Sequence, residues 1–94
     1  DTFNKIAAEF EISTRRLLSY NDLHKRHLLQ PGELLYLEKK AAKAQKGYKY
    51  HIVKQGETLW DIAQLYGIRL GKLLGKNNFP KHFQAETGTK VRVR

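Results

Sequence analysis

Apolar residues recur at helical spacing in two stretches of the chain, residues 3–10 and residues 59–66. In the later stretch, four apolar residues occupy positions i, i+3, i+4 and i+7: Leu59, Ile62, Ala63 and Tyr66. The earlier stretch keeps the same spacing and begins at Phe3. This periodicity is typical of a short helix that buries one face and leaves the other in solvent.

Turn-forming and capping residues frame the later stretch. Thr58 precedes the apolar stripe and Asp61 follows three residues later, which is the spacing of a capping box. Gly67 suits the stop of this helix. Upstream, the run Tyr50–Lys54 is rich in strand-forming residues and is ended by Gly56. The pattern therefore predicts a strand, a tight turn and a short capped helix.

The two stretches belong to an internal repeat. Shifting the chain by 56 positions without a gap superposes residues 1–38 on residues 57–94. Nine residues of the first copy are identical in the second: Thr2, Ile6, Ala7, Ile12, Leu17, Leu18, Asn21, Lys25 and Gly32. Most of them are core-type residues or turn formers, which a shared fold requires.

The repeat predicts an α+β fold of two small βααβ units in tandem. We expect four helices, two in each unit: about Thr2–Phe10, Ser13–Tyr20, Thr58–Tyr66 and Leu70–Lys76. We also expect three strands: Glu33–Leu37, Tyr50–Lys54 and Lys90–Arg94. The predicted unit boundaries are 1–38 and 49–94, with an exposed basic linker at 39–48. The first unit lacks its opening strand, and we expect the protein to continue upstream by about one strand.

Charge is unevenly distributed along the 94 residues. The formal net charge is +9, and the excess lies in residues 39–94, whereas residues 1–38 carry −1. A basic half can attract nucleic acid, acidic lipid or an anionic polymer, although the simpler and preferred explanation is a solvated surface with a lysine-rich linker. The chain has no cysteine, which excludes disulfide bonds and thiol chemistry. No apolar run reaches the length of about 20 residues that a membrane span needs.

The run Tyr50–Ile68, followed by Leu73–Asn78, resembles the LysM domain. The shared features are an opening strand, Gly56-Glu57-Thr58-Leu59, an Ile-Ala pair, a second helix that ends in asparagine, and a closing strand. The resemblance implies a βααβ fold that binds N-acetylglucosamine-containing glycans such as peptidoglycan and chitin. The pair of units is also similar to the C-terminal region of bacterial glucosaminidase-type cell-wall hydrolases. In the first unit Asn4 replaces Trp60 and Lys5 replaces Asp61, which departs from the pattern.

The resemblance also implies a binding groove between the turn before the first helix and the loop after the second. In the second unit the corresponding residues are Gly56, Glu57, Thr58, Leu59, Asn77, Asn78, Phe79 and Pro80. In the first unit they are Asp1, Thr2, Phe3, Asn21, Asp22, Leu23 and His24. An N-acetyl sugar offers an amide and apolar C–H faces, and a shallow site at converging loops can supply partners for both.

Each of these residues also has a structural explanation. The threonines can serve only as helix caps, and Leu59 and Phe3 lie on buried stripes. Asn77 and Asn21 can simply close their helices. Phe79 is a better binding candidate, because a loop aromatic has no helical face to fill. Trp60 can stack on a sugar or merely cover a helix end.

Catalytic patterns are sparse. Glu57 and Asp61 are carboxylates four residues apart, as in a glycosidase, but the cap explains Asp61 and its counterpart is Lys5. His24 and His27 have a spacing that suits a metal, yet no third ligand is well placed. We therefore expect no catalytic residues, no metal and no cofactor.

These observations predict a non-catalytic carbohydrate-binding module. Its partner would be peptidoglycan or another N-acetylglucosamine polymer, and it would anchor a covalently attached upstream domain, such as a cell-wall hydrolase, to the wall. The expected location is secreted or in the bacterial cell envelope. The alternatives are a basic nucleic-acid-binding module, less expected because the Lys and Arg are scattered, and a protein-interaction module. The steepness of the salt dependence separates nucleic-acid binding from neutral-sugar binding.

Overall fold

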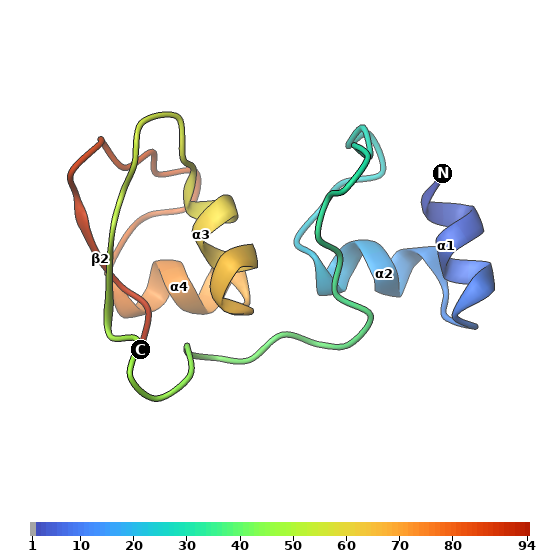
Figure 1. The fold of residues 1–94 in the computed structure, drawn as a ribbon, viewed down its shortest axis with the longest axis horizontal. Helices are drawn as coiled ribbons and strands as arrows, with labels where there is room; N and C mark the ends of the chain where they lie inside the picture. The colour runs from blue at the N-terminus through green and yellow to red at the C-terminus, as the bar shows by residue number, and fades with distance from the viewer. Residues whose placement is uncertain (1) are drawn as a thin grey trace. The chain divides into compact units, whose positions relative to one another are not determined.

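The computed structural model describes residues 2–94 and divides into two units, residues 1–40 (unit 1) and residues 41–94 (unit 2). In unit 1, helix α1 spans Phe3–Glu9 and helix α2 spans Thr14–Tyr20. In unit 2, strand β1 (Tyr50–Ile52), helix α3 (Leu59–Tyr66), helix α4 (Leu70–Lys76) and strand β2 (Lys90–Arg92) follow in order (Figure 1). The small α+β fold predicted from the sequence is confirmed. None of the described helices is long and apolar enough to span a membrane.

Helix α3 begins with the predicted capping box. The Asp61 N–H donates to Thr58 Oγ1 at 3.1 Å, and the Thr58 N–H donates to Asp61 Oδ2 at 2.8 Å. The helix ends at Gly67, whose φ of 66° lies in the left-handed region. Helix α4 begins at Leu70 without a side-chain cap, because arginine stands at its N-cap.

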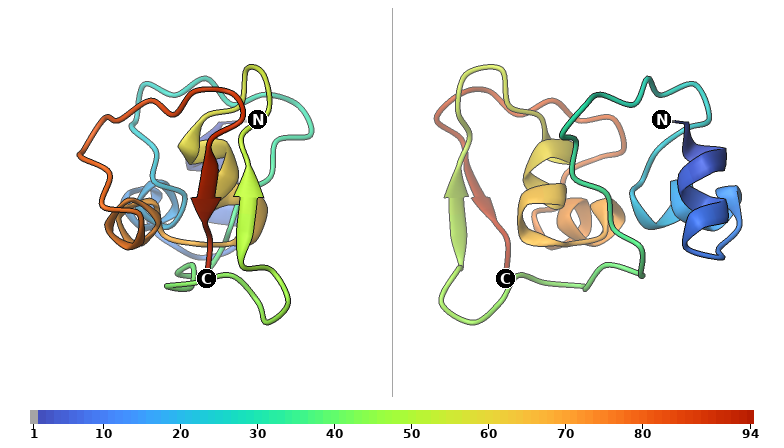
Figure 2. Two further views of the ribbon diagram at one scale, coloured as in Figure 1. Left: turned by 90° about the vertical axis from the view of Figure 1, so that its left-hand side faces the viewer. Right: turned by 45° about the vertical axis from the view of Figure 1, so that its right-hand side comes forward.

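The two strands of unit 2 pair in antiparallel fashion. His51 lies opposite Val91, with Tyr50 opposite Arg92 and Ile52 opposite Lys90. His51 and Val91 are buried, while the residues on either side of each are exposed, so that one face of the sheet covers the core. Figure 2 (left) shows the outer face of the two strands toward the viewer, with α3 and α4 of the same unit behind them.

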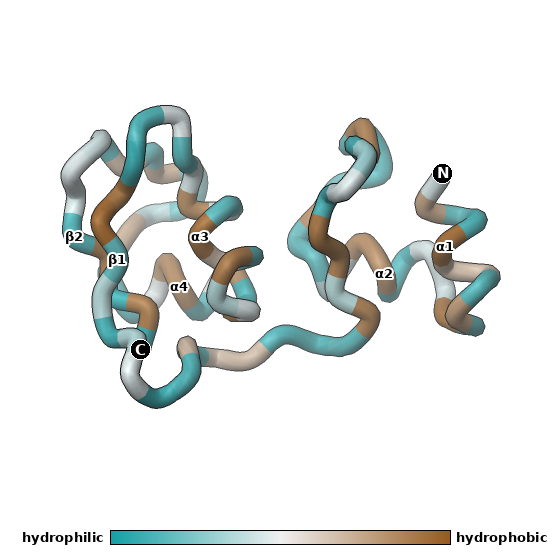
Figure 3. The backbone as a smooth tube through the Cα atoms, in the orientation of Figure 1, coloured by the Kyte–Doolittle hydropathy of each residue, from teal (hydrophilic) through white to brown (hydrophobic). Residues whose placement is uncertain are grey.

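The core of unit 2 lies between this sheet and the helix pair. Nine buried residues form it: Ala44, Val53, Leu59, Ile62, Ala63, Ile68, Leu73, Val91 and Val93. All three leading residues of the predicted α3 stripe are among them, and Tyr66 packs against their edge. Figure 3 shows apolar and polar positions following one another along α3, as a helix with one buried face requires.

Unit 1 repeats the helix pair around a smaller core. Thr2 Oγ1 accepts from the Lys5 N–H at 3.2 Å, and Ser13 Oγ accepts from the Arg16 N–H at 3.1 Å, so both predicted caps are present. The buried core residues are Phe3, Ala7 and Leu17, with seven partly buried apolar side chains packed against them.

The strand predicted at Glu33–Leu37 is wrong. Residues 33–37 form no strand in the structure. A strand needs a hydrogen-bonded neighbour, and residues 2–40 supply no second strand to pair with. Asn21 instead holds this segment: its Oδ1 accepts from the Tyr36 N–H at 2.6 Å and its Nδ2 donates to the Tyr36 carbonyl at 2.9 Å.

The segment predicted as an exposed linker is partly incorporated into unit 2. Ala44 is 1% exposed and belongs to the core, and its N–H donates to the Val93 carbonyl at 2.7 Å. Ala41 forms an isolated parallel bridge with Ile68. The prediction of full exposure failed because alanine can fill a small core position, although it gives little apolar signal in a lysine-rich stretch. Lys40 is also buried, in unit 1, where its Nζ lies 2.7 Å from Asp22 Oδ2.

Candidate functional site

A groove of about 340 Å³ lies where the turn before α3 meets the loop between α4 and β2. We call it the unit 2 groove. Its lining consists of Lys54, Gly56, Glu57, Thr58 and Leu59 from the turn, and Phe83, Gln84, Ala85 and Thr87 from the loop. All four turn residues proposed from the sequence line this groove.

The turn that forms one wall of the groove is held by reciprocal bonds. The Glu57 N–H donates to the Lys54 carbonyl at 3.0 Å, and the Lys54 N–H donates to Glu57 Oε1 at 3.0 Å. Gly56 has a φ of 77°, a conformation that side chains with a Cβ rarely adopt. Leu59 is buried at the start of α3 and forms part of the groove floor and part of the core.

A buried histidine ties the turn to the body of unit 2. His51 Nε2 lies 2.8 Å from Glu57 Oε1, and His51 Nδ1 lies 2.8 Å from the Tyr66 hydroxyl. In the neutral tautomer with its hydrogen on Nε2, histidine donates to the carboxylate and accepts from the phenol. Burial, followed by the nearby Glu57 carboxylate, raises the pKa of Tyr66, which favours the phenol form that donates.

The Glu57 carboxylate is stabilised in its ionised form. Burial by itself would raise the pKa of Glu57, but the hydrogen bonds from the Lys54 N–H and the His51 ring, together with the Lys54 ammonium, outweigh burial. The pKa of Glu57 therefore lies below its ordinary value. The carboxylate fixes the turn geometry, and through it the backbone groups that face the groove.

The opposite wall carries a stacked aromatic pair. The rings of Phe79 and Phe83 lie 4.5 Å apart at an interplanar angle of 22°. Phe79 packs against the core, whereas Phe83 is 39% exposed and lines the groove. Phe79, which the sequence favoured as a contact residue, therefore supports the aromatic surface from below, and Phe83 presents it.

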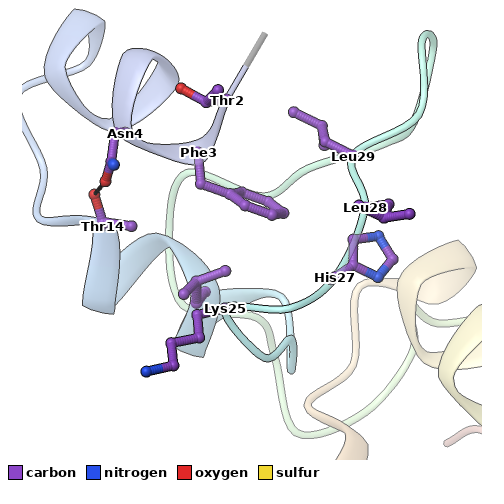
Figure 4. Close-up of a pocket in the computed structure, with 9 residues that line it drawn as sticks. Thr2, Phe3, Asn4, Thr14, Lys25, His27, Leu28 and Leu29 are labelled. Carbon is purple, nitrogen blue, oxygen red and sulfur yellow. Dashed lines mark hydrogen bonds between the residues drawn. The ribbon is translucent and has the colours of Figure 1, made fainter.

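Unit 1 has a corresponding groove of about 430 Å³, which we call the unit 1 groove (Figure 4). Its lining residues are Thr2, Phe3, Asn4, Thr14, Leu18, Lys25, His27, Leu28 and Leu29. The Phe3 ring points toward the loop that carries His27, Leu28 and Leu29, while the Lys25 ammonium points away from it (Figure 4). Leu28 is 78% exposed, which places a large apolar side chain at the groove rim.

Five positions related by the 56-residue shift line both grooves. They are Thr2 and Thr58, Phe3 and Leu59, His27 and Phe83, Leu28 and Gln84, and Leu29 and Ala85. The three loop positions were not predicted from the sequence, because the predicted loop contacts of unit 2 ended at Pro80. The aligned ring-bearing residues His27 and Phe83, in a loop without helical periodicity, were the signal that could have found them.

The remaining predicted residues do not line these grooves. Asn77 donates to the Leu73 and Arg92 carbonyls and accepts from the Arg92 N–H, and Asn21 makes the equivalent bonds in unit 1. Leu23 packs on the unit 1 core, as Phe79 does in unit 2. The other predicted residues that lie away from the groove linings are Asp22, His24, Asn78 and Pro80. Asp1 lies outside the described residues.

The grooves are suited to shape-based recognition of a neutral ligand. Each combines residues at the start of a helix with an apolar or aromatic wall from the loop, and the unit 2 groove adds the tight turn before α3. The two carboxylates considered as a catalytic pair both have structural partners, since Glu57 bonds to His51 and Asp61 bonds to Thr58. Among residues 2–94, no group of three or more His, Asp or Glu side chains is placed to hold a metal ion.

Comparison with known proteins identifies a family and two similar proteins. Residues 1–37 and 51–94 both match the family described as the LysM domain. The chain is 34% identical over 80 residues to the autolysin of Enterococcus faecalis (strain ATCC 700802 / V583), covering 78% of this chain and 11% of that protein. A crystal structure of the Bacillus cereus spore cortex-lytic enzyme SleL aligns with all of this chain and 20% of its own, with 21% identity and a TM-score of 0.47.

Proposed function

The chain belongs to the LysM family, and from this premise we propose that it is a non-catalytic module that binds N-acetylglucosamine-containing glycans, peptidoglycan in particular. LysM domains are binding modules for such polymers, which supports the general function. The finer proposal is that both grooves bind the sugar chain. The observation that carries it is the presence of equivalent lining residues in the two units.

The chemistry of the grooves supports a glycan. The C–H face of a pyranose ring needs a flat apolar surface, which Phe83 offers in unit 2 and Leu28 offers in unit 1. The N-acetyl amide needs backbone partners, and the turn at Gly56–Thr58 lies on the facing wall. Such shallow sites bind weakly on their own. Two of them on one chain gain affinity through effective concentration when both reach the same polymer.

We further propose that the module anchors an attached catalytic domain at the cell wall. The autolysin that it resembles is about nine times as long as the matched region, because the match spans 11% of that protein. The name autolysin denotes lysis of the cell that makes the protein, and a wall-binding module would hold such an activity on its substrate. The chain would then act outside the cytoplasm, in the cell envelope or secreted.

Titration with N-acetylglucosamine oligomers and with soluble peptidoglycan fragments tests this proposal. Two-dimensional NMR should show amide shifts at Gly56–Leu59 and at Phe83–Thr87, and at the equivalent positions of unit 1. Shifts at Asn77–Pro80 should be smaller, because none of these residues lines the unit 2 groove. Perturbation confined to residues 39–49 would refute the groove assignment.

A further inference from the structure

The charges of unit 2 are separated in space. Residues 41–94 contain eleven Lys and Arg against three Asp and Glu. The three acidic residues lie in or next to the segments that line the unit 2 groove. Glu57 is part of the turn, and Asp61 bonds to Thr58 of that turn. Glu86 lies between two lining residues of the loop, Ala85 and Thr87. The cations of α4 and of the outer face of the sheet therefore belong to segments without acidic residues.

Four of these cations come together at the end of α4. Lys76 Nζ donates to the Ala42 carbonyl at 2.6 Å, which brings its ammonium next to Lys43. Lys72 lies one helical turn before Lys76 on the same face. Arg92 is held close to the helix end because its backbone bonds to Asn77 at 2.7 Å. Burial, and then the charges of Arg92, Lys43 and Lys72, lower the pKa of Lys76, as mutual proximity requires.

The cationic surface continues across the sheet. Lys90 and Arg92 point to the outer face, since Val91 between them is buried. Lys90 Nζ lies 4.2 Å from the centroid of the Tyr50 ring, and Lys49 Nζ lies 5.6 Å from it. We call this surface the basic strip, and its cations are Lys43, Lys49, Lys72, Lys76, Lys90 and Arg92.

We propose that the basic strip binds a linear phosphodiester polymer that carries no bases. Two pairs of these cations have a similar spacing: Lys90 and Arg92 are two residues apart on a strand, about 6.6 Å, and Lys72 and Lys76 are four residues apart on a helix, about 6 Å. A flexible polymer with one negative charge in each short repeat can follow such a row, whereas an isolated anion would meet only one or two cations.

The two tyrosines at and beside the basic strip argue against nucleic acid, because the Tyr48 ring packs 5.9 Å from that of Tyr66 and the Tyr50 ring is covered by a cation. Binding of single strands without sequence preference relies on aromatic faces that stack on bases. Lys90 covers a face of the Tyr50 ring, so this ring is already engaged by a cation. A polyol phosphate needs no stacking surface, and the strip offers it charge alone. This site rests on the strip and not on the glycan grooves, so the two functions succeed or fail separately.

The test uses the full chain and a matched pair of triple variants. Lys72→Gln/Lys90→Gln/Arg92→Gln removes three exposed charges from the strip and leaves Lys76, with its bond to Ala42, in place. Lys5→Gln/Arg15→Gln/Arg16→Gln removes three exposed charges from unit 1 as the control. The probes are a defined-length poly(glycerol phosphate) and a single-stranded oligonucleotide with the same number of phosphates, each titrated by calorimetry at several salt concentrations.

The parent chain should bind poly(glycerol phosphate) with an affinity that falls steeply as salt rises. Losing three phosphate contacts should reduce the slope of log K against log salt by about 2 for a single strand. The strip variant should therefore bind at least about tenfold more weakly at low salt, while the control variant stays within about twofold of the parent. Binding of N-acetylglucosamine oligomers should be the same in all three proteins.

Three results would overturn the proposal. Equal losses in the two triple variants would mean that net charge alone attracts the polymer. No loss in the strip variant would mean that the polymer binds elsewhere. Tighter binding of the oligonucleotide than of poly(glycerol phosphate) would mean that the surface recognises nucleic acid. Thermal unfolding of each variant confirms that it is folded before it is titrated.

Discussion

Asn77 hydrogen-bonds to the backbone N–H and carbonyl of Arg92 through both polar atoms of its side-chain amide. Its Oδ1 accepts from the Arg92 N–H at 2.7 Å, and its Nδ2 donates to the Arg92 carbonyl at 2.8 Å. The same Nδ2 donates to the Leu73 carbonyl in the last turn of α4 at 2.8 Å. Asn21 repeats this arrangement on Tyr36 in unit 1. The asparagine that ends each second helix therefore docks the closing segment onto that helix.

This docking predicts a structural effect of Asn77→Ala. The variant loses three hydrogen bonds, each worth about 0.5–1.5 kcal/mol, so the free energy of unfolding of unit 2 should fall by about 2–4 kcal/mol. Urea titration followed by amide signals of unit 2 measures this loss. The control is Asn78→Gly on the next residue, whose φ of 56° glycine adopts readily, and it should change stability little. Equal effects of the two substitutions would contradict the docking role.

The core of unit 2 should tolerate little loss of volume. Ile62 and Leu73 are both fully buried. Ile62→Ala and Leu73→Ala should each cost about 2–4 kcal/mol, which is a large part of the stability of so small a unit. Leu65→Ala on α3, the helix that carries Ile62, is the matched control, because Leu65 is 58% exposed. Circular dichroism during thermal unfolding measures all three, and a fully stable Leu73→Ala protein would mean that the core is misplaced.

The Glu57 carboxylate predicts a pH dependence with a definite sign. Its pKa in the folded protein is lowered from the ordinary value of 4.5, so the unfolded chain binds this proton more readily. The stability contributed by Glu57 is therefore present above about pH 4.5 and is lost as the pH falls through the lowered pKa. Glu57→Gln should be less stable than the parent at about pH 7, and the difference should shrink in acid. Urea titrations over this pH range would contradict the assignment if the difference stayed constant.

The groove walls predict which side chains carry glycan affinity. Phe83→Ala should weaken binding of N-acetylglucosamine oligomers to unit 2 roughly tenfold, because an aromatic surface worth about 1–1.5 kcal/mol is removed. Leu28→Ala should have a similar but smaller effect in unit 1. Phe10→Ala is the control, since Phe10 is 50% exposed and lies outside the lining of the unit 1 groove. Unit-by-unit NMR titration separates these effects, and equal losses for Phe10→Ala and Phe83→Ala would refute the groove contacts.

The closing segment of unit 1, residues 33–37, forms no strand, and this predicts fast amide exchange at Leu37. Leu37 corresponds to Val93, whose N–H donates to the Lys49 carbonyl at 2.8 Å, and residues 2–40 contain no strand that could supply such a partner. The Leu37 amide should therefore exchange with solvent faster than the Val93 amide. Adding a peptide with the sequence of Tyr50–Lys54, or extending the chain upstream by one strand, should slow exchange at Leu35 and Leu37. Unchanged exchange with either addition would show that the segment accepts no strand.

A cavity in unit 1 marks the place where an added strand could pack against the closing segment. A cavity of about 320 Å³ is lined by Ile6, Leu29, Gln30, Pro31, Gly32, Glu33 and Leu35. In unit 2 the residues equivalent to Gly32 and Glu33 are Gly88 and Thr89, which exchange hydrogen bonds with the backbone of Val53. Val53 fills the core there. An apolar residue of an added strand would occupy the cavity in the same way.

Local signals in the sequence were sufficient to predict the helices and the two-stranded sheet of unit 2. Helix caps such as Thr58 and Ser13 bond to residues only three positions away. The apolar stripes likewise repeat within one or two helical turns. Both signals can therefore be recognised in the sequence before the fold is known. The strand at residues 33–37 was wrong because strand formation depends on a partner that the segment itself does not contain. The burial of Ala44 was missed because its contact with Val93 spans 49 residues of sequence.

The candidate site could be predicted only on its turn side. Gly56–Leu59 form a compact motif, and they line the groove. The loop side depends on how residues 77–89 turn back after α4, which the repeat alone does not specify. Asn77, which the sequence suggests as a ligand contact, instead bonds to the backbone of Arg92. The exposed aromatic side chain of the loop is Phe83, which lies further along the sequence.

The burial of Ala44 bears on how the second repeat can be excised as an independent cassette. A chain cut at residue 51, where the second LysM match begins, would lose Ala44 and the bridge from Ala41 to Ile68. The backbone groups of Gly67, Arg69 and Val93 would then lose the hydrogen bonds that these two alanines make. A cassette for transfer to another protein should therefore start at residue 41, so that residues 41–49 are kept together with the βααβ fold.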